Sequence, residues 1–244
     1  NGYHIGGFIG GVGKTQDSPT QSAIQIFNAL NTAQIEGNGA DIGGIIGLIN
    51  NDTITTHLHS VYSSGLITGS GSDQGAIIGE LNRAITLSGV VYLTSTENQA
   101  IGKTFNSPTI NGTPIPAHIA QMVSLDTFAD LGWNIAGESD PVTTWAIGYE
   151  GGKTFPYLTA HNNPTNNQLI TLNSQEQAYL NDVNNGIFLL NNKESLDLIQ
   201  EIGHYLLTSD ISLGGDEWEP IPNFSGTLDG NGYTISDLTI STQT

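Results

Sequence analysis

Short apolar segments bounded by glycine recur along the first hundred residues. They read IGGFIG at 5–10, IGGIIG at 42–47 and QGAIIG at 74–79, and a reduced copy, AIG, lies at 100–102. The first two steps between equivalent glycines are 37 and 32 residues, and aligning Ala100 with Ala76 gives a third step of 24. Self-similarity at a period of 20–50 residues is typical of stacked-repeat architectures. We therefore expect each copy to be a buried strand whose glycines form tight corners with unusual backbone angles.

A second landmark keeps the same spacing. Ile35 and Ile67 are 32 residues apart, as are Gly37 and Gly69, and strand patterns surround both pairs. Like residues recurring at a fixed step favour parallel stacking, with about 4.8 Å between layers. The sequence thus predicts one coil of two or three short strands per repeat, with strands at 23–27, 34–37, 54–62, 66–69 and 85–93.

Residues 106–158 differ from the repeats that precede them. Proline interrupts the pattern at three positions, and a helix is expected at 119–131. Phe128, Trp133 and Trp145 then supply large apolar side chains. A stack of coils needs its open end covered, so we predict that residues 1–158 are solenoid coils followed by a cap.

The polar stretch 159–168 is the predicted linker, and the remainder, 169–244, contains helical signals. Ser174 and Gln177 fit a capping box for a first helix, and Asn192 is placed to cap a second. We expect this helix pair to close the other end of the tube. The predicted inward side chains of the two helices and the residue that stops the second are Ala178, Tyr179, Val183, Leu196, Ile199, Ile202 and Gly203.

The end of the chain has strand and turn patterns. Residues 205–213 alternate as a strand, and the run Asp229-Gly230-Asn231-Gly232 predicts a tight turn. Together with the helical segment, residues 169–244 are interpreted as a helical cap and the first coils of a following module.

Composition narrows the function classes. The 244 residues carry 23 acidic and 5 basic side chains, a net charge of −18, and no cysteine. Nucleic-acid binding needs a basic surface, so it is excluded as an expectation. No apolar run approaches 18 residues, which gives no reason to expect membrane insertion. A surface of short uncharged polar residues and glycine is typical of extracellular β-solenoids.

Three stretches resemble the GLUG-repeat β-solenoid modules of bacterial surface adhesins and secreted proteins. The glycine phrases resemble the repeat itself, residues 207–235 resemble the opening of the module, and residues 121–158 resemble its ending. The resemblance covers most of the chain. It implies an all-β, right-handed parallel β-helix with a structural or adhesive role and no catalytic residues.

The order of these stretches departs from that family, because the ending precedes the opening. Joining Thr244 to Asn1 restores an uninterrupted module. We therefore expect the chain to be about one period of a longer array, cut inside a module. Its copies would be joined covalently or would self-associate as a filament.

Candidate chemistry is sparse, and we assign no catalytic, cofactor-binding or metal-ligating residue. His57 and His59 share a strand face near Asp52, but no third ligand is apparent. A Ca²⁺ site is the alternative to turn and capping roles for a group of acids, although calcium-loop spacing is missing. These acids are Asp210, Asp216, Glu217, Glu219 and Asp229.

The rival to a structural role is a carbohydrate-active lyase or hydrolase, or a carbohydrate-binding module, on the same fold. Arg83 is the single arginine and Lys103 is its nearest lysine in sequence, which offers little for abstraction of a proton from a uronate. Acids on adjacent coils beside a base would favour this rival. A sugar platform is the alternative to burial in caps for Trp133, Trp145, Trp218, Tyr149 and Tyr157.

Overall fold

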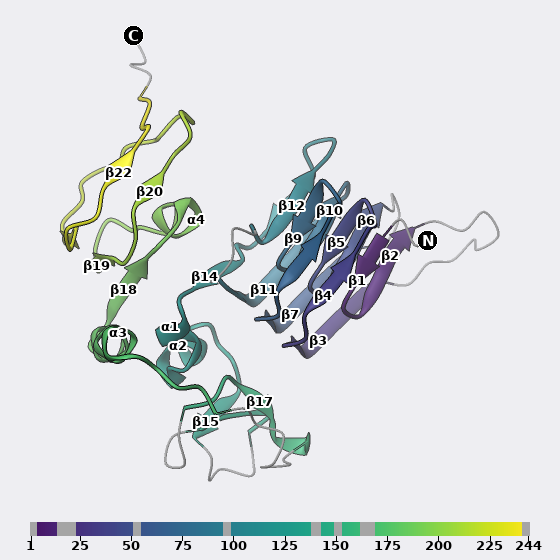
Figure 1. Ribbon diagram of the computed structural model, residues 1–244, viewed down its shortest axis with the longest axis horizontal. Helices are drawn as coiled ribbons and strands as arrows, with labels where there is room; N and C mark the ends of the chain where they lie inside the picture. Colours follow the sequence, from purple (N-terminus) through teal and green to yellow (C-terminus); the bar gives the residue numbers. More distant parts are fainter. Residues whose placement is uncertain are drawn as a thin grey trace.

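A computed structural model describes residues 4–13, 23–50, 55–94, 99–137, 143–148, 153–161 and 169–240. The chain is built mostly of strands in parallel sheets, with few and short helices (Figure 1). Strand β16 pairs with β17 in antiparallel fashion, and the other named strand pairs run parallel. The prediction of parallel strand stacking is confirmed.

Strands from successive repeats lie side by side in the N-terminal part. The first sheet contains β1 (His4–Gly6), β5 (Asp41–Gly43) and β9 (Asp73–Gly75). The second contains β2 (Ile9–Gly13), β6 (Ile46–Asn50), β10 (Ile78–Leu81) and β12 (Ile101–Thr104). The third contains β3 (Ile24–Asn31), β7 (Thr56–Ser63), β11 (Ile85–Leu93), β13 (Ile110–Asn111) and β14 (Ile115–Ala117). Strands β4 (Ile35–Gly37) and β8 (Ile67–Gly69) form a fourth, smaller sheet.

The predicted register is confirmed for the first two steps and wrong for the third. Gly6 lies opposite Gly43 and Gly43 opposite Gly75, which are the steps of 37 and 32 residues. At the reduced copy, Ile101 lies opposite Ile78, a step of 23 rather than 24. Ala100 therefore corresponds to Ile77, and its carbonyl accepts the Ile77 N–H at 2.9 Å. The two copies are therefore aligned by an apolar residue followed by isoleucine, at 77–78 and 100–101. They are not aligned by the alanine that both contain, Ala76 and Ala100.

The glycine phrase is a corner rather than a single strand. In the second copy, β5 ends at Gly43, Gly44 and Ile45 form a bend, and β6 begins at Ile46. A Cβ added at Gly43 would overlap the carbonyl oxygen of Ile46 and lie 2.7 Å from the backbone nitrogen of Gly79. The expectation of unusual backbone angles is wrong at Gly43, which is not among the described glycines with positive φ. Glycine is needed there because two strands approach each other backbone to backbone.

Aliphatic side chains fill the space that these sheets enclose. Equivalent residues stack along it, as with Ile45 over Ile77 and Ile46 over Ile78, and all four are fully buried. Burial of this kind contributes about 25 cal/mol per Å² of apolar surface removed from water. Burial of the isoleucine column therefore stabilises the N-terminal part.

The aromatic residues predicted for the cap are buried. Phe128 and Trp145 are fully buried and Trp133 is nearly so, and the two indole rings lie 4.7 Å apart. The hydroxyl of Tyr62, on β7, donates to the carbonyl of Pro156 at 2.8 Å, which ties the coils to this segment. A small sheet of β15 (Ile135–Gly137), β16 (Trp145–Ile147) and β17 (Tyr157–Leu158) completes it, and a 3₁₀ turn, η1 (Thr159–His161), follows.

The helix predicted at 119–131 is two short helices, α1 (Ile119–Met122) and α2 (Leu125–Asp130). His118 caps α1 through a capping box with Gln121, which the sequence analysis did not recognise. Val123 ends α1, and Ser124 begins the next helix in extended conformation. The periodicity of the run is that of a helix, but the extended residue between the two turns divides it.

Residues 169–240 form α3 (Ser174–Asn184), β18 (Ile187–Leu190), α4 (Lys193–Leu196), β19 (His204–Leu207), β20 (Ile211–Ser212), β21 (Thr227–Asp229) and β22 (Ile235–Ser236). Two parallel sheets, β18-β19-β21 and β20-β22, repeat the layered arrangement. The strand predicted at 205–213 is thus divided between two sheets. The predicted turn at 229–232 is confirmed, with positive φ at Asn231 and Gly232.

Both helices in this part differ in detail from the prediction. The capping box of α3 uses Asn173 and Glu176, one residue before the predicted pair. Tyr179 is buried as predicted, but Ala178 is exposed. Asn192 caps α4 as predicted, yet α4 ends at Leu196 rather than at the predicted stop, Gly203, so Ile202 is 77% exposed.

Helix α3 packs against α1, and α4 lies against β14. Ser124 donates a hydrogen bond to Asn184 at 3.1 Å, and the His118 ring meets Tyr179 edge-on. The expectation that these helices close the opposite end of the tube is wrong, because they contact the cap segment. Within the described part of the chain, no strand of 169–240 pairs with β1, β2, β3 or β4. Of the predicted linker 159–168, residues 162–168 lie outside the described residues.

Candidate functional site

The pair His57 and His59, to which the sequence analysis assigned no metal, has no third ligand among the described residues. His57 and His59 lie on the same face of β7, but Asp52 is outside the described residues. His59 faces Phe27 edge-on, with ring centroids 5.7 Å apart, and its Nδ1 lies 3.4 Å from the carbonyl oxygen of Ser88. The neighbours of His57 across the ladder are Gln25 and Thr86, which add no carboxylate.

Three of the five acids considered for Ca²⁺ have partners in the structure. Asp210 accepts the backbone N–H of Thr234 at 2.7 Å, and Asp229 accepts that of Asn231 at 2.8 Å. Asp216 forms an ion pair with Lys193. In the described residues these acids do not form a group close enough to share a cation. The turn role preferred in the sequence analysis accounts for Asp229, whereas Asp210 bonds to Thr234, 24 residues further along the chain.

Two of the five aromatic residues considered for a sugar platform are buried in the core. Trp133 and Trp145 are buried, and Trp218 and Tyr157 are half-buried. Tyr149 lies outside the described residues. The buried indoles cannot present an open face to a sugar.

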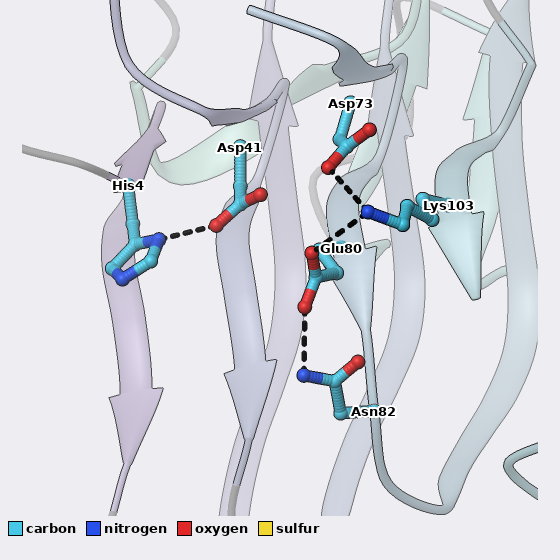
Figure 2. Close-up of polar contacts among 6 residues, drawn as sticks. All are labelled: His4, Asp41, Asp73, Glu80, Asn82 and Lys103. Atoms are coloured by element: carbon cyan, nitrogen blue, oxygen red, sulfur yellow. Dashed lines mark hydrogen bonds and ion pairs between the residues drawn. The ribbon is translucent and has the colours of Figure 1, made fainter. Parts of the chain in front are cut away.

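A charged cluster that was not predicted from the sequence spans the first and second sheets (Figure 2). Carboxylate oxygens of Asp41, Asp73 and Glu80 all lie within 4.8 Å of one another. The ammonium of Lys103 lies 3.1 Å from Asp73 and 3.6 Å from Glu80, between the two carboxylates. His4 pairs with Asp41 through its Nδ1. Five charged or titratable side chains, each on a different strand, thus meet here.

The strand ladder brings these residues together. His4, Asp41 and Asp73 each precede the glycine phrase by one residue, so they stack directly over one another on β1, β5 and β9. Glu80 and Lys103 are likewise opposite each other on β10 and β12. The spacing of 37 and 32 residues in the repeat already implied the first of these columns, because an ionisable residue recurs at the same position.

The two central acids have opposite pKa shifts. Burial raises the pKa of Asp41, the charges of Glu80 and Asp73 raise it further, and its hydrogen bond with His4 opposes them. Burial also acts to raise the pKa of Asp73, but hydrogen bonds from Ser72 and Lys103 and the Lys103 charge outweigh it, so the pKa is lowered. Hydrogen bonding to Asp73 raises the pKa of Lys103. Asp73 is therefore the charged member and Asp41 the one that more readily holds a proton.

The chemistry open to the cluster follows from its burial. Asp41 and Asp73 are only 3% and 6% exposed, so a polymeric substrate has little access to either carboxyl group. Glu80 is half-buried and also accepts a hydrogen bond from Asn82 at 2.7 Å. Asp41, Asp73 and Glu80 have the oxygen ligands that a hard cation prefers, but Lys103 already supplies positive charge between two of them. The arrangement is best described as an ion-pair ladder along the coils.

Two hollows lie away from this cluster. A cavity of about 200 Å³ is lined by α1 and α2 on one side and by residues around β18 on the other. A more open hollow of about 560 Å³ lies between α3 and strands β19 and β21. Polar side chains on its wall include Gln175, Asp182, His204, Asp229 and Asn231.

No described helix is both long and apolar enough to cross a bilayer. Comparisons with protein-family models, with curated proteins and with solved structures find no match to this chain. A function is therefore inferred from the residues and the geometry described above.

Proposed function

We propose that this chain is a structural or adhesive segment of an extracellular bacterial surface protein, without catalysis. In this proposal its coils form a right-handed parallel β-helix of the GLUG-repeat kind. The observation that carries the proposal is the register of Ile9, Ile46, Ile78 and Ile101, which lie opposite one another on four adjacent strands. Repeated backbone ladders of this type make a stiff rod, because each coil is hydrogen-bonded to its neighbours along its length.

Surface composition supports the same role. With 23 acidic and 5 basic residues, the outer faces repel one another and keep a rod soluble. The chain has no cysteine, so its stability rests on the ladders and the apolar core rather than on disulfides. The charged cluster fits a structural role, because its inner carboxylates are buried and paired.

A carbohydrate-active enzyme is the rival that the charged cluster raises. Incubation of the protein with a panel of neutral and uronate polysaccharides tests it, with release of reducing ends and absorbance of unsaturated uronates as readouts. We expect no turnover above a heat-inactivated sample. Turnover that disappears in Asp73→Asn or Lys103→Met, while circular dichroism shows that the variant is still folded, would replace the structural proposal by an enzymatic one.

Carbohydrate binding without catalysis is a second candidate, and the 560 Å³ hollow is the observation that favours it. Its volume is that of a typical ligand site, and its amide, imidazole and carboxylate groups suit hydroxyl-rich ligands. Calorimetric titration with oligosaccharides tests this candidate, with Asp182→Ala as the site variant and Asp126→Ala, in the smaller cavity, as the control. A binding isotherm lost only in the former would support adhesion through this hollow.

Location is tested independently of mechanism. Antibodies raised against the chain should label intact cells of the source organism, and protease added outside those cells should remove the label. Labelling that appears only after lysis would contradict an extracellular role.

A further inference from the structure

In the part of the chain that the structure describes, no strand pairs with the outer side of the first layer of the N-terminal coils. This first layer, residues 4–13 and 23–37, contains β1, β2, β3 and β4, and each of them is an edge strand in the described sheets. Phe8 is 55% exposed, whereas Ile45 and Ile77, at the equivalent position of the next two layers, are fully buried. The side chain at this position is thus fully buried in the layers that have a neighbouring layer on each side.

The last layer of the C-terminal part shows the same pattern. This last layer, residues 224–240, contains β21 and β22, which end their sheets. Leu228 is 47% exposed, whereas Tyr205, opposite it in the preceding layer, is 6% exposed. Leu238 and Ile240 are 45% and 50% exposed. Unpaired strand edges with exposed apolar side chains invite pairing with another chain.

The two layers lie at opposite ends of the molecule, so one copy cannot cover its own first layer with its last (Figure 1). Both are edges of parallel stacks. The last layer of one copy can therefore add to the first layer of another copy, along the direction in which the strands of each copy stack.

The distribution of charge favours association of two copies through the first and last layers over association through the sides of the molecule. The described ionisable groups of the first layer are His4 and Glu36, and the described carboxylates of the last layer are Asp229 and Asp237. With 23 acids in the chain, the great majority lie outside these two layers. Approach side by side is therefore opposed by repulsion that end-to-end approach largely avoids.

We propose that the last layer of one copy packs on the first layer of a second copy, in parallel and head to tail. The proposal rests on the proposed structural function and identifies its partner as the chain itself. A head-to-tail interface joins two different surfaces, so each added copy leaves one free end of each kind. Association then continues into filaments unless the rotation between copies closes a ring.

Two blocked variants test the proposal. Phe8→Asp blocks the first layer and Leu228→Asp blocks the last, with Phe27→Asp and Ile240→Asp as second choices should either fail to fold. Phe105→Asp is the matched control, because Phe105 is 53% exposed and lies outside both layers. Far-ultraviolet circular dichroism and the urea midpoint establish that each variant is folded.

Sedimentation velocity over a dilution series, with negative-stain microscopy at the highest concentration, gives the readout. We expect the parent and the Phe105→Asp control to form oligomers that grow with concentration, and each blocked variant alone to be monomeric. An equimolar mixture of Phe8→Asp and Leu228→Asp should form dimers and nothing larger, because each retains the surface that the other lacks.

Other outcomes would overturn the proposal. Dimers of either blocked variant alone would show that like surfaces meet, and loss of association in the control would show that another surface is used. A parent that stays monomeric throughout also rejects head-to-tail stacking. Such a result leaves the structural function standing, since that function is judged separately by polysaccharide turnover and by surface labelling.

Discussion

Ile45 donates its backbone N–H to the carbonyl oxygen of Ile77 at 2.9 Å, although the two residues are 32 positions apart. Both side chains are fully buried in the same apolar cluster. The same phrase in the sequence therefore sets both the backbone ladder and the packing of the core. This relationship makes each layer depend on the layers beside it, which is the behaviour expected of stacked repeats.

Ile77→Ala tests how much the isoleucine column contributes. Removing a fully buried aliphatic side chain loses its transfer free energy and leaves a cavity, so we expect a loss of about 2–5 kcal/mol in the free energy of unfolding. Urea denaturation followed by circular dichroism measures it. Ile202→Ala is the control, because Ile202 is 77% exposed, and we expect it to change stability by less than about 0.5 kcal/mol. Similar losses at both positions would contradict the assigned core.

Gly43→Ala tests the corner between β5 and β6. The added methyl group would overlap the Ile46 carbonyl oxygen, and backbone cannot move aside as a side chain can. We expect a loss of at least about 3 kcal/mol, at the upper end of overpacking effects. Gly137→Ala is the matched control, because a Cβ there meets no atom within 4 Å. If both alanine variants unfold at the same urea concentration, the close approach of the two strands is not what requires glycine.

The sequence predicted the stacking because repeated corners and repeated buried positions require like residues at fixed steps. The pairs Ile35–Ile67 and Gly6–Gly43 followed directly from that requirement. Helix ends were harder, since neighbouring residues compete as caps: Asn173 and Ser174 both suit the role, and the structure uses Asn173. The contact of α3 with α1 was not predicted, because nothing in a local pattern states which surface a helix covers.

The charged cluster was only partly predictable from the spacing of the repeats. The column of His4, Asp41 and Asp73 is readable from the same spacing as the glycines. The arrival of Lys103 beside Asp73 depends on the shortened third step, which was assigned one residue too long. Long side chains on adjacent strands also meet diagonally, and a linear pattern does not specify those contacts.

Ser60→Gly is expected to stabilise the protein. Asn28, Ser60 and Gly89 occupy one position in three layers, and all have positive φ between 52° and 58°. A non-glycine residue in this conformation costs roughly 1–2 kcal/mol, so glycine should recover about 1 kcal/mol at Ser60. Ser88 precedes Gly89 on β11 and does not have positive φ. Ser88→Gly should therefore lower the free energy of unfolding by about 0.5–1 kcal/mol. Thermal and urea unfolding of both variants measure the difference, and a loss at Ser60 would contradict the assignment.

The opposite pKa shifts of Asp41 and Asp73 predict opposite effects of their amide variants. The pKa of Asp41 is raised in the folded state above its ordinary value of 3.8. Its contribution to stability is therefore present below about pH 3.8 and lost as the pH rises through the raised value. At neutral pH Asp41→Asn should remove a buried charge that faces Asp73 and Glu80, and should raise the urea midpoint while keeping a partner for His4.

Asp73→Asn should do the reverse. The pKa of Asp73 is lowered, so its contribution is present above about pH 3.8 and lost as the pH falls through the lowered value. At neutral pH this variant leaves Lys103 without its nearer carboxylate and should lower the urea midpoint, with the difference from the parent shrinking in acid. Urea midpoints measured from pH 3 to pH 8 for the parent and both variants test the pair, with Asp126→Asn, at an exposed position of helix α2, as the control. Midpoint changes of the same sign for Asp41→Asn and Asp73→Asn at neutral pH would show that the two carboxyl groups do not divide charge and proton in this way.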